Sequence, residues 1–123
     1  MLIVEDDEDS RELLEMFLRS QGAHVRAVAC AADARAAIRE LVPDVLLADI
    51  TLPDESGFDF VGSLRADPAT RHIPAIAMTG HTDAAARQQA LGAGFHSLVT
   101  KPLDIWSLAA DVARLAAATS KPA

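Results

Sequence analysis

Short apolar runs alternate along the chain with longer segments in which apolar residues recur at every third or fourth position. The short runs cover residues 2–4, 24–28, 45–48, 75–78 and 97–99. Runs of this length are typical of strands, and those at 45–48 and 75–78 contain no polar residue. Strands that are apolar on both faces are typical of parallel sheets covered by helices on both sides. The pattern therefore predicts five buried, parallel strands.

The segments that follow the strands have the spacing of amphipathic helices. Their apolar stripes are formed by Leu13, Leu14, Phe17 and Leu18, by Ala34, Ala37, Ile38 and Leu41, by Phe60, Val61 and Leu64, and by Ile105, Leu108, Ala109, Val112, Leu115 and Ala116. A further helix, the fourth, is rich in alanine. Ser56 and Asp83 are predicted to cap the third and fourth helices. Gly22, Pro43 and Gly92 are predicted to end the first, second and fourth helices.

The strict alternation of strands and helices predicts a three-layer α/β fold, in which helices cover both faces of an open, doubly wound, five-stranded parallel sheet. The length of 123 residues suits one domain, which we predict over residues 1–118 with a flexible tail at 119–123. In sheets of this kind a ligand binds beyond the carboxyl ends of the strands. Chemistry is therefore expected in the residues that directly follow the strands.

Composition and charge narrow the class of partners. The net charge is −7 and no run of Lys or Arg is present, which argues against direct binding to nucleic acid. No apolar stretch approaches the roughly 20 residues that span a bilayer, and Glu5 makes the N-terminus acidic too early for a signal peptide. We therefore expect a cytoplasmic protein that makes no contact with a membrane.

A distinctive set of polar residues follows the strands, namely Glu5, Asp6, Asp7, Asp49, Thr79 and Lys101. Each alone has a plain structural explanation, such as a negative charge at a helix N-terminus or a turn residue. Together they would place several carboxylates at one edge of the sheet, where these groups repel unless a cation binds or a pKa rises. Carboxylate oxygens without nearby His or Cys favour Mg²⁺, which keeps waters that a phosphate can displace. The set therefore predicts a Mg²⁺-dependent site for phosphoryl transfer to a carboxylate.

The spacing of these residues resembles that of a known family. Asp49 ends the apolar run of 45–48 and is followed by Pro53 four residues later and by Gly57 eight residues later. Thr79 and Lys101 lie 30 and 52 residues after Asp49. Along nearly its whole length the chain resembles the receiver domain of two-component response regulators, similar to the chemotaxis regulators. The resemblance implies a flavodoxin-like fold with the strand order 2-1-3-4-5.

The resemblance also implies a metal site with defined ligands. Asp6 would contact Mg²⁺ directly, together with an oxygen of Asp49 and the backbone carbonyl of Thr51. Glu5 would hold the ion through a water molecule. Asp7 stands at a variable position of the family and is expected to lie outside the metal shell.

The same resemblance implies the roles in phosphoryl transfer. Asp49 would accept the phosphoryl group from a histidine kinase or a histidine phosphotransfer domain. Lys101 would pair with the phosphoryl oxygens, and its bond to Pro102 is expected to be cis. Thr79 would turn to hydrogen-bond the phosphate, and the surface of helix 4, strand 5 and helix 5 would then change for a partner protein or a homodimer. The protein would be a signalling domain of a phosphorelay rather than an enzyme.

Three residues beyond this signature bear on how the domain would signal. Leu98 occupies the position at which many receivers have a Tyr or Phe, so a switch based on an aromatic ring is not available. His81 is predicted to influence the lifetime of the phosphate. Trp106 is expected to be partly in the core, although with Ala110, Ala113 and Ala117 it could form a shallow apolar stripe for a partner. Segments 79–83 and 94–102 are similar to receivers attached to hybrid histidine kinases.

Other interpretations use part of the same evidence. A phosphatase of the haloacid-dehalogenase type also has an aspartate nucleophile and Mg²⁺, but it needs a second acidic cluster after a later strand, where this chain has Thr79. A flavodoxin-like nucleotide binder needs a Gly-rich phosphate loop, which follows none of the strands. A degenerate receiver that acts as a protein-interaction module without phosphorylation remains the alternative, and only Leu98 favours it.

Overall fold

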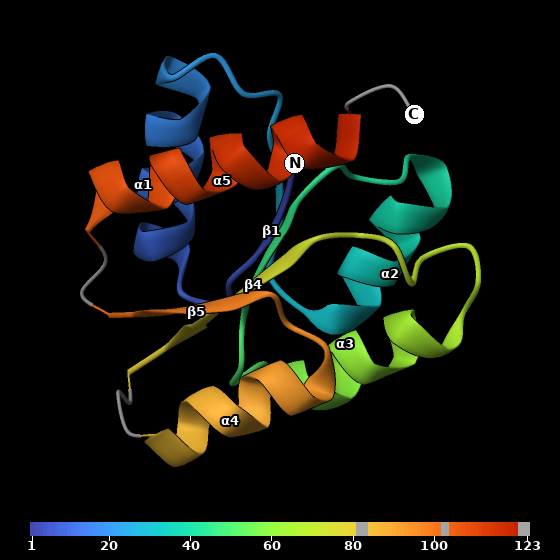
Figure 1. Cartoon of the computed structure of the whole chain (residues 1–123). Coiled ribbons are helices and arrows are strands. Elements are labelled where there is room, and N and C mark those ends of the chain that lie inside the picture. The colour runs from blue at the N-terminus through green and yellow to red at the C-terminus, as the bar shows by residue number, and fades with distance from the viewer. Residues whose placement is uncertain (81–83, 102–103, 121–123) are drawn as a thin grey trace.

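The computed structural model describes residues 1–80, 84–101 and 104–120 and contains a single parallel sheet (Figure 1). In chain order the elements are β1 (Leu2–Val4), α1 (Glu8–Ser20), β2 (Arg26–Val28), α2 (Ala31–Glu40), β3 (Leu46–Asp49), α3 (Gly57–Ala66), β4 (Ala75–Thr79), α4 (Ala84–Ala93), β5 (Ser97–Thr100) and α5 (Ile105–Ser120). The strand order is β2-β1-β3-β4-β5, and every pair of neighbours is parallel. The predicted three-layer, doubly wound fold and its strand order are confirmed.

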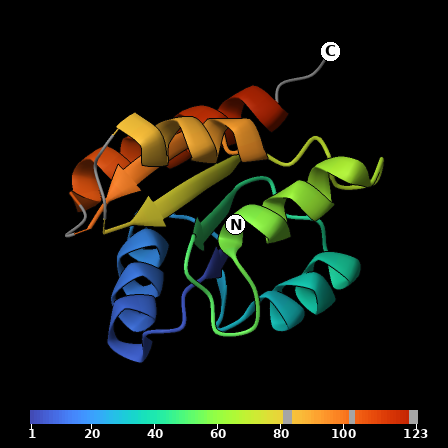
Figure 2. The same ribbon diagram turned by 90° about the horizontal axis from the view of Figure 1, so that it is seen from below.

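Two apolar cores cover the two faces of the sheet. Ile3, Leu47 and Ile76 point to one face and pack with buried residues of α1 and α5. Leu46 and Ala77 point to the other face and pack with residues of α2, α3 and α4. Figure 1 shows this division, with α1 and α5 on one side and the other three helices on the opposite side; in Figure 2, seen from below, α4 overlaps α5. Because side chains alternate along a strand, continuous apolar strands are needed to supply both cores.

The helix stripes predicted from spacing are correct for most positions but wrong for two leucines. Leu14 and Leu18 of α1 are buried, whereas Leu13 is 56% exposed. In the second helix, Leu41 is 79% exposed because α2 ends at Glu40 and Leu41 has an extended backbone with φ −154° and ψ 117°. The chain therefore leaves the helix before Pro43, and Leu41 no longer lies on the helical face that spacing assigned to it.

The ends of the other helices follow from local hydrogen bonds. Ser56 caps α3 by accepting a hydrogen bond from the amide of Phe58 at 3.1 Å, as predicted. Gly22 has a positive φ of 92° and follows the end of α1, in agreement with its predicted role as a stop. The predicted cap Asp83 lies outside the described residues.

The C-terminal boundary differs from the sequence-based expectation. Helix α5 continues to Ser120, so Thr119 and Ser120 belong to the helix rather than to a tail. Among the described helices, none is long and apolar enough to cross a membrane.

Candidate functional site

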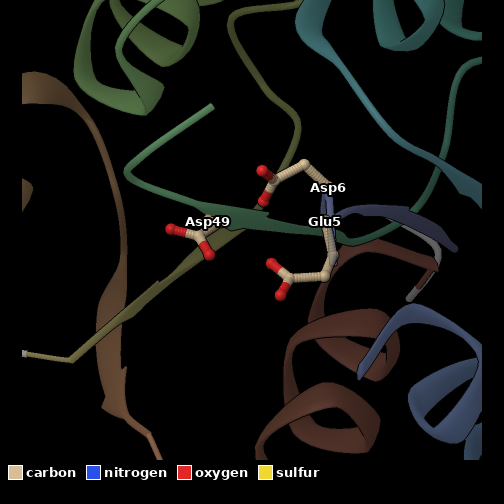
Figure 3. Close-up of side chains that lie close together, drawn as sticks. All are labelled: Glu5, Asp6 and Asp49. Carbon is tan, nitrogen blue, oxygen red and sulfur yellow. The ribbon is translucent and has the colours of Figure 1, made fainter. Parts of the chain in front are cut away.

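Three carboxylates meet at the carboxyl ends of β1 and β3, which are neighbours in the sheet. Glu5 and Asp6 directly follow β1, and Asp49 is the last residue of β3. One oxygen from each side chain can be chosen so that the three oxygens lie within 4.8 Å of one another (Figure 3). Glu5 is 1% exposed and Asp49 is 7% exposed, whereas Asp6 faces solvent. The predicted acidic cluster therefore exists, and it has one open side.

Lys101 brings a positive charge to this cluster from the end of β5. Its Nζ atom donates hydrogen bonds to Glu5 Oε1 at 2.9 Å and to Asp49 Oδ2 at 2.6 Å. The Lys101 amide is held by the carbonyl of Thr79 at 2.7 Å, which fixes the start of the lysine side chain beside β4. The lysine side chain reaches from the end of β5, an edge strand, to the acidic cluster, and its positive charge partly neutralises the negative charge of the cluster.

The pKa values of Glu5 and Asp49 are shifted in opposite directions although their carboxyl groups are neighbours. Burial, together with the neighbouring Asp49 carboxylate, raises the pKa of Glu5 from 4.5 to about 7, although Lys101 acts in the opposite direction. Burial also acts to raise the pKa of Asp49, but the neighbouring Glu5 carboxyl group and the hydrogen bonds from Lys101 and the Thr51 amide outweigh it, so the pKa of Asp49 lies below its ordinary value. Asp49 is therefore ionised at neutral pH.

A second feature of Glu5 points to an additional ligand. Its Oε2 atom is buried and has no hydrogen-bond partner among the described residues. A buried carboxylate oxygen without a partner is costly, and a bound cation or a water in the shell of one would relieve this cost. With hard oxygen donors from three side chains and no His or Cys among them, the cluster fits Mg²⁺.

The segment between β3 and α3 shapes the other side of the site. The amide of Thr51 donates a hydrogen bond to Asp49 Oδ1 at 2.8 Å, and the amide of Gly57 donates one to the carbonyl of Ile50 at 2.8 Å. Thr51 and Ser56 form an isolated antiparallel bridge, which closes the segment into a compact loop. The loop thus orients the Asp49 carboxylate through the backbone. The role of the Thr51 carbonyl as a metal ligand remains a prediction.

Thr79 lies at the same edge of the sheet, as predicted. It ends β4, is 2% exposed and pairs in register with Thr100, the residue before Lys101. Leu98 pairs with Ala77 in the interior of the sheet and packs against the core formed with α2, α3 and α4. Phe95 is 3% exposed and meets Phe58 edge to face at 6.4 Å, so its ring belongs to that core.

Arg11 is a site residue that sequence reasoning missed. Its Nη1 atom donates to the carbonyl of Glu5 at 3.0 Å and lies 3.5 Å from that of Asp6, so it holds the backbone that carries both carboxylates. Asp7, next in the chain, caps α1 by accepting from the amide of Ser10 at 2.9 Å. A positive charge near a helix N-terminus is unfavourable with respect to the helix dipole. The presence of Arg11 near the start of α1 was therefore the sequence feature that could have indicated its role in the site.

Other residues singled out from the sequence lie away from the acidic cluster or outside the described residues. Trp106 is 70% exposed rather than partly in the core, and its ring meets Phe17 of α1 edge to face at 5.3 Å. Trp106, at the start of α5, therefore packs beside α1. His81 and Pro102, with its predicted cis bond, lie outside the described residues.

The fold and the cluster together define a class of protein, a doubly wound α/β domain with an acidic pocket and a lysine at the carboxyl edge of its sheet. The model of the response regulator receiver domain matches residues 1–113. The chain therefore belongs to the response regulator receiver domain family, whose members are signalling domains of two-component systems.

Individual relatives agree with this assignment. The chain is 36% identical over 104 residues to the uncharacterized 14.6 kDa protein in the sodA1 3' region of Leptolyngbya boryana, a match that covers 85% of this chain and 79% of that protein. It is 35% identical to the DNA-binding response regulator MtrA of Mycolicibacterium smegmatis, with 100% of this chain and 53% of MtrA covered. The chain thus spans about half the length of MtrA.

A solved structure supports the same fold. The signal receiver domain of a signal transduction histidine kinase from Syntrophus aciditrophicus superposes with a TM-score of 0.90 at 28% identity, covering 99% of this chain and 92% of that one.

Proposed function

We propose that this receiver accepts a phosphoryl group on Asp49 from the phosphohistidine of a histidine kinase or a histidine phosphotransfer domain, in a Mg²⁺-dependent reaction. The observation that carries the proposal is the contact of Lys101 Nζ with both Asp49 and Glu5, at 2.6 and 2.9 Å. An ionised aspartate beside a lysine and two further carboxylates has the groups that phosphoryl transfer to a carboxylate requires.

In the proposed reaction an oxygen of Asp49 forms a bond to phosphorus while the bond from phosphorus to the imidazole nitrogen of the donor breaks. After the transfer, Lys101 would bind one oxygen of the phosphoryl group, and the hydroxyl of Thr79 would donate a hydrogen bond to another. Glu5, Asp6, Asp49 and the Thr51 carbonyl would hold the Mg²⁺, which when bound neutralises charge that develops on the phosphoryl oxygens. The product would be an acyl phosphate on Asp49.

The signal would leave the domain through a partner protein. The relative from Syntrophus aciditrophicus is part of a histidine kinase, and MtrA is a DNA-binding response regulator. The first relationship supports a receiver joined to a hybrid kinase that passes the group onward. The second supports a receiver whose surface of α4, β5 and α5 changes for an output domain or a homodimer. A cytoplasmic location accords with either.

The test is intact-mass spectrometry after incubation with Mg²⁺ and acetyl phosphate. We expect the mass of one phosphoryl group to appear on the wild type, to require Mg²⁺ and to be lost in Asp49→Asn. The matched control is Asp44→Asn, since Asp44 stands just before β3 at the opposite edge and pairs with the N-terminal amine. Absence of the adduct in the wild type would contradict phosphorylation and favour a degenerate receiver that acts as an interaction module.

A further inference from the structure

Asp54, in the segment between β3 and α3, makes an unusual pair of contacts with a distant helix. Its Oδ1 and Oδ2 atoms accept hydrogen bonds from the amides of Ala31 at 3.0 Å and Ala32 at 2.9 Å. The first amides of a helix have no partner within the helix, and a side chain at the N-cap normally satisfies one of them. Cys30 is the N-cap of α2 and makes no such bond. Asp54 therefore caps α2 from 22 and 23 residues further along the chain.

A second connection lies one residue further on. Glu55 forms an ion pair with Arg35 of α2, and both side chains are partly buried. Arg35 also donates a hydrogen bond to Ser63 Oγ of α3 at 3.0 Å, and its guanidinium lies 5.1 Å from the centre of the Phe60 ring. Two adjacent residues of the segment are thus attached to α2, and α2 is attached in turn to α3.

The other end of this segment belongs to the acidic site. Thr51, three residues before Asp54, donates its amide hydrogen to Asp49 Oδ1 at 2.8 Å. The segment is short and closed by the bridge between Thr51 and Ser56. A shift at Asp54 would therefore reach the amide that orients the Asp49 carboxylate.

We propose that Asp54 is a positioning residue, which holds residues 50–56 against the N-terminus of α2 so that the Thr51 amide stays on the Asp49 carboxylate. The functional importance of this contact rests on the proposed role of Asp49 as the phosphoryl acceptor. The hydrogen bonds from Ala31 and Ala32 also lower the pKa of Asp54, so its carboxylate is ionised at neutral pH and suits the positive end of the helix dipole.

The experiment must separate positioning from the simple stabilisation of α2. Asp54→Ala removes both functions, but Cys30→Asp in the same background supplies a local cap, because Cys30 already has the extended backbone of an N-cap residue. The matched control is Asp59→Ala, which removes an exposed carboxylate from the first turn of α3. Urea unfolding reports stability, and solvent-exchange NMR of the metal-free protein reports the Thr51 amide.

We expect Cys30→Asp to restore the stability lost in Asp54→Ala, while the Thr51 amide still exchanges about fivefold faster than in the wild type, as the loss of one hydrogen bond predicts. Titration with Mg²⁺, followed by amide shifts, should give an affinity about tenfold weaker in the double variant, as for residues that support metal ligands. Asp59→Ala should change neither the exchange rate of the Thr51 amide nor the affinity for Mg²⁺.

Thr51 exchange at the wild-type rate in Asp54→Ala, or in Asp54→Ala combined with Cys30→Asp, would overturn the proposal and leave Asp54 as a helix cap only. Failure of the proposed function is a separate result, because it would be seen as a wild type that takes no phosphoryl group. The exchange rate of the Thr51 amide in the metal-free protein decides the role of Asp54 in either case.

Discussion

The side chain of Glu5 is enclosed between Lys101 and Asp49 and keeps one oxygen without a partner among the described residues. Its carboxyl group therefore has two ways to lower its energy, by binding a proton or by binding a cation. With a pKa of about 7, the two compete near neutral pH. The protonation of Glu5 would thus affect how readily the acidic cluster takes a metal ion.

This competition predicts that Mg²⁺ affinity depends on pH. Because ligands bind metal in the ionised form, we expect the dissociation constant to be about tenfold larger at about pH 6 than at about pH 8, with about half a proton released on binding at about pH 7. Isothermal titration calorimetry in two buffers of different ionisation enthalpy measures both quantities. In Glu5→Gln the affinity should be weaker but nearly constant over this range. An equal pH dependence in Glu5→Gln would show that another group is responsible.

The same shift has a consequence for stability in the absence of metal. The pKa of Glu5 in the folded protein lies above its ordinary value of 4.5. Its contribution is therefore fully present below that value and is lost as the pH rises through about 7. The contribution of Asp49, whose pKa is lowered, depends on pH in the opposite direction. It is present above the ordinary value of 3.8 and is lost as the pH falls through the lower pKa of the folded state.

At the scale of the element, the start of α3 is packed directly against the end of β3. A Cβ atom placed on Gly57 would lie 2.6 Å from Ile50 Cα and would also overlap the Asp49 carbonyl oxygen. Both contacts are with backbone, which cannot move aside as a flexible side chain can. The absence of a side chain at Gly57 therefore allows α3 to begin close to Asp49.

Two alanine substitutions within α3 test this close approach. Gly57→Ala should lower the free energy of unfolding by about 1–3 kcal/mol, since the β3–α3 segment must shift. Gly62→Ala is the matched control, because nothing lies within 4 Å of a Cβ at that position. We expect it to raise the free energy of unfolding by about 0.5–1 kcal/mol through helix propensity. Urea unfolding measures both, and a similar effect of the two substitutions would contradict tight packing at Gly57.

At the scale of the whole molecule, the acidic cluster exists only in the folded state, because Asp49 lies more than 40 residues along the chain from Glu5 and Asp6. A cation that binds the cluster therefore stabilises the fold by mass action. At a Mg²⁺ concentration about 100 times the dissociation constant, we expect a gain of about 2.7 kcal/mol and a rise of about 10 °C in the Tm.

Differential scanning calorimetry with and without Mg²⁺ measures this rise, with potassium chloride of equal ionic strength in the reference. Asp6→Asn is the matched variant, because Asp6 is exposed and its substitution should leave the core intact. The rise should be largely lost in Asp6→Asn. An equal rise in both proteins would show that the effect is general screening of the negative charge.

The fold could be predicted from the sequence alone because its signals are local and repeated. Apolar strand runs, helical spacing and caps such as Ser56 each reflect the chemistry of nearby residues. The candidate site could be predicted because parallel strands bring their carboxyl ends to one edge, which placed Glu5, Asp6, Asp49, Thr79 and Lys101 together before any contact was known.

What only the tertiary structure decided concerns the exposure of single side chains and contacts between distant segments. Spacing could not show that Leu13 and Leu41 are exposed, because burial depends on where neighbouring elements end. The raised pKa of Glu5 depends on burial among groups remote in sequence. The capping of α2 by Asp54 joins residues 22 and 23 positions apart, and no local pattern encodes such a bond. The sequence by itself determined the architecture and the chemical type of the site, whereas the packing of distant segments decided its electrostatics and its support.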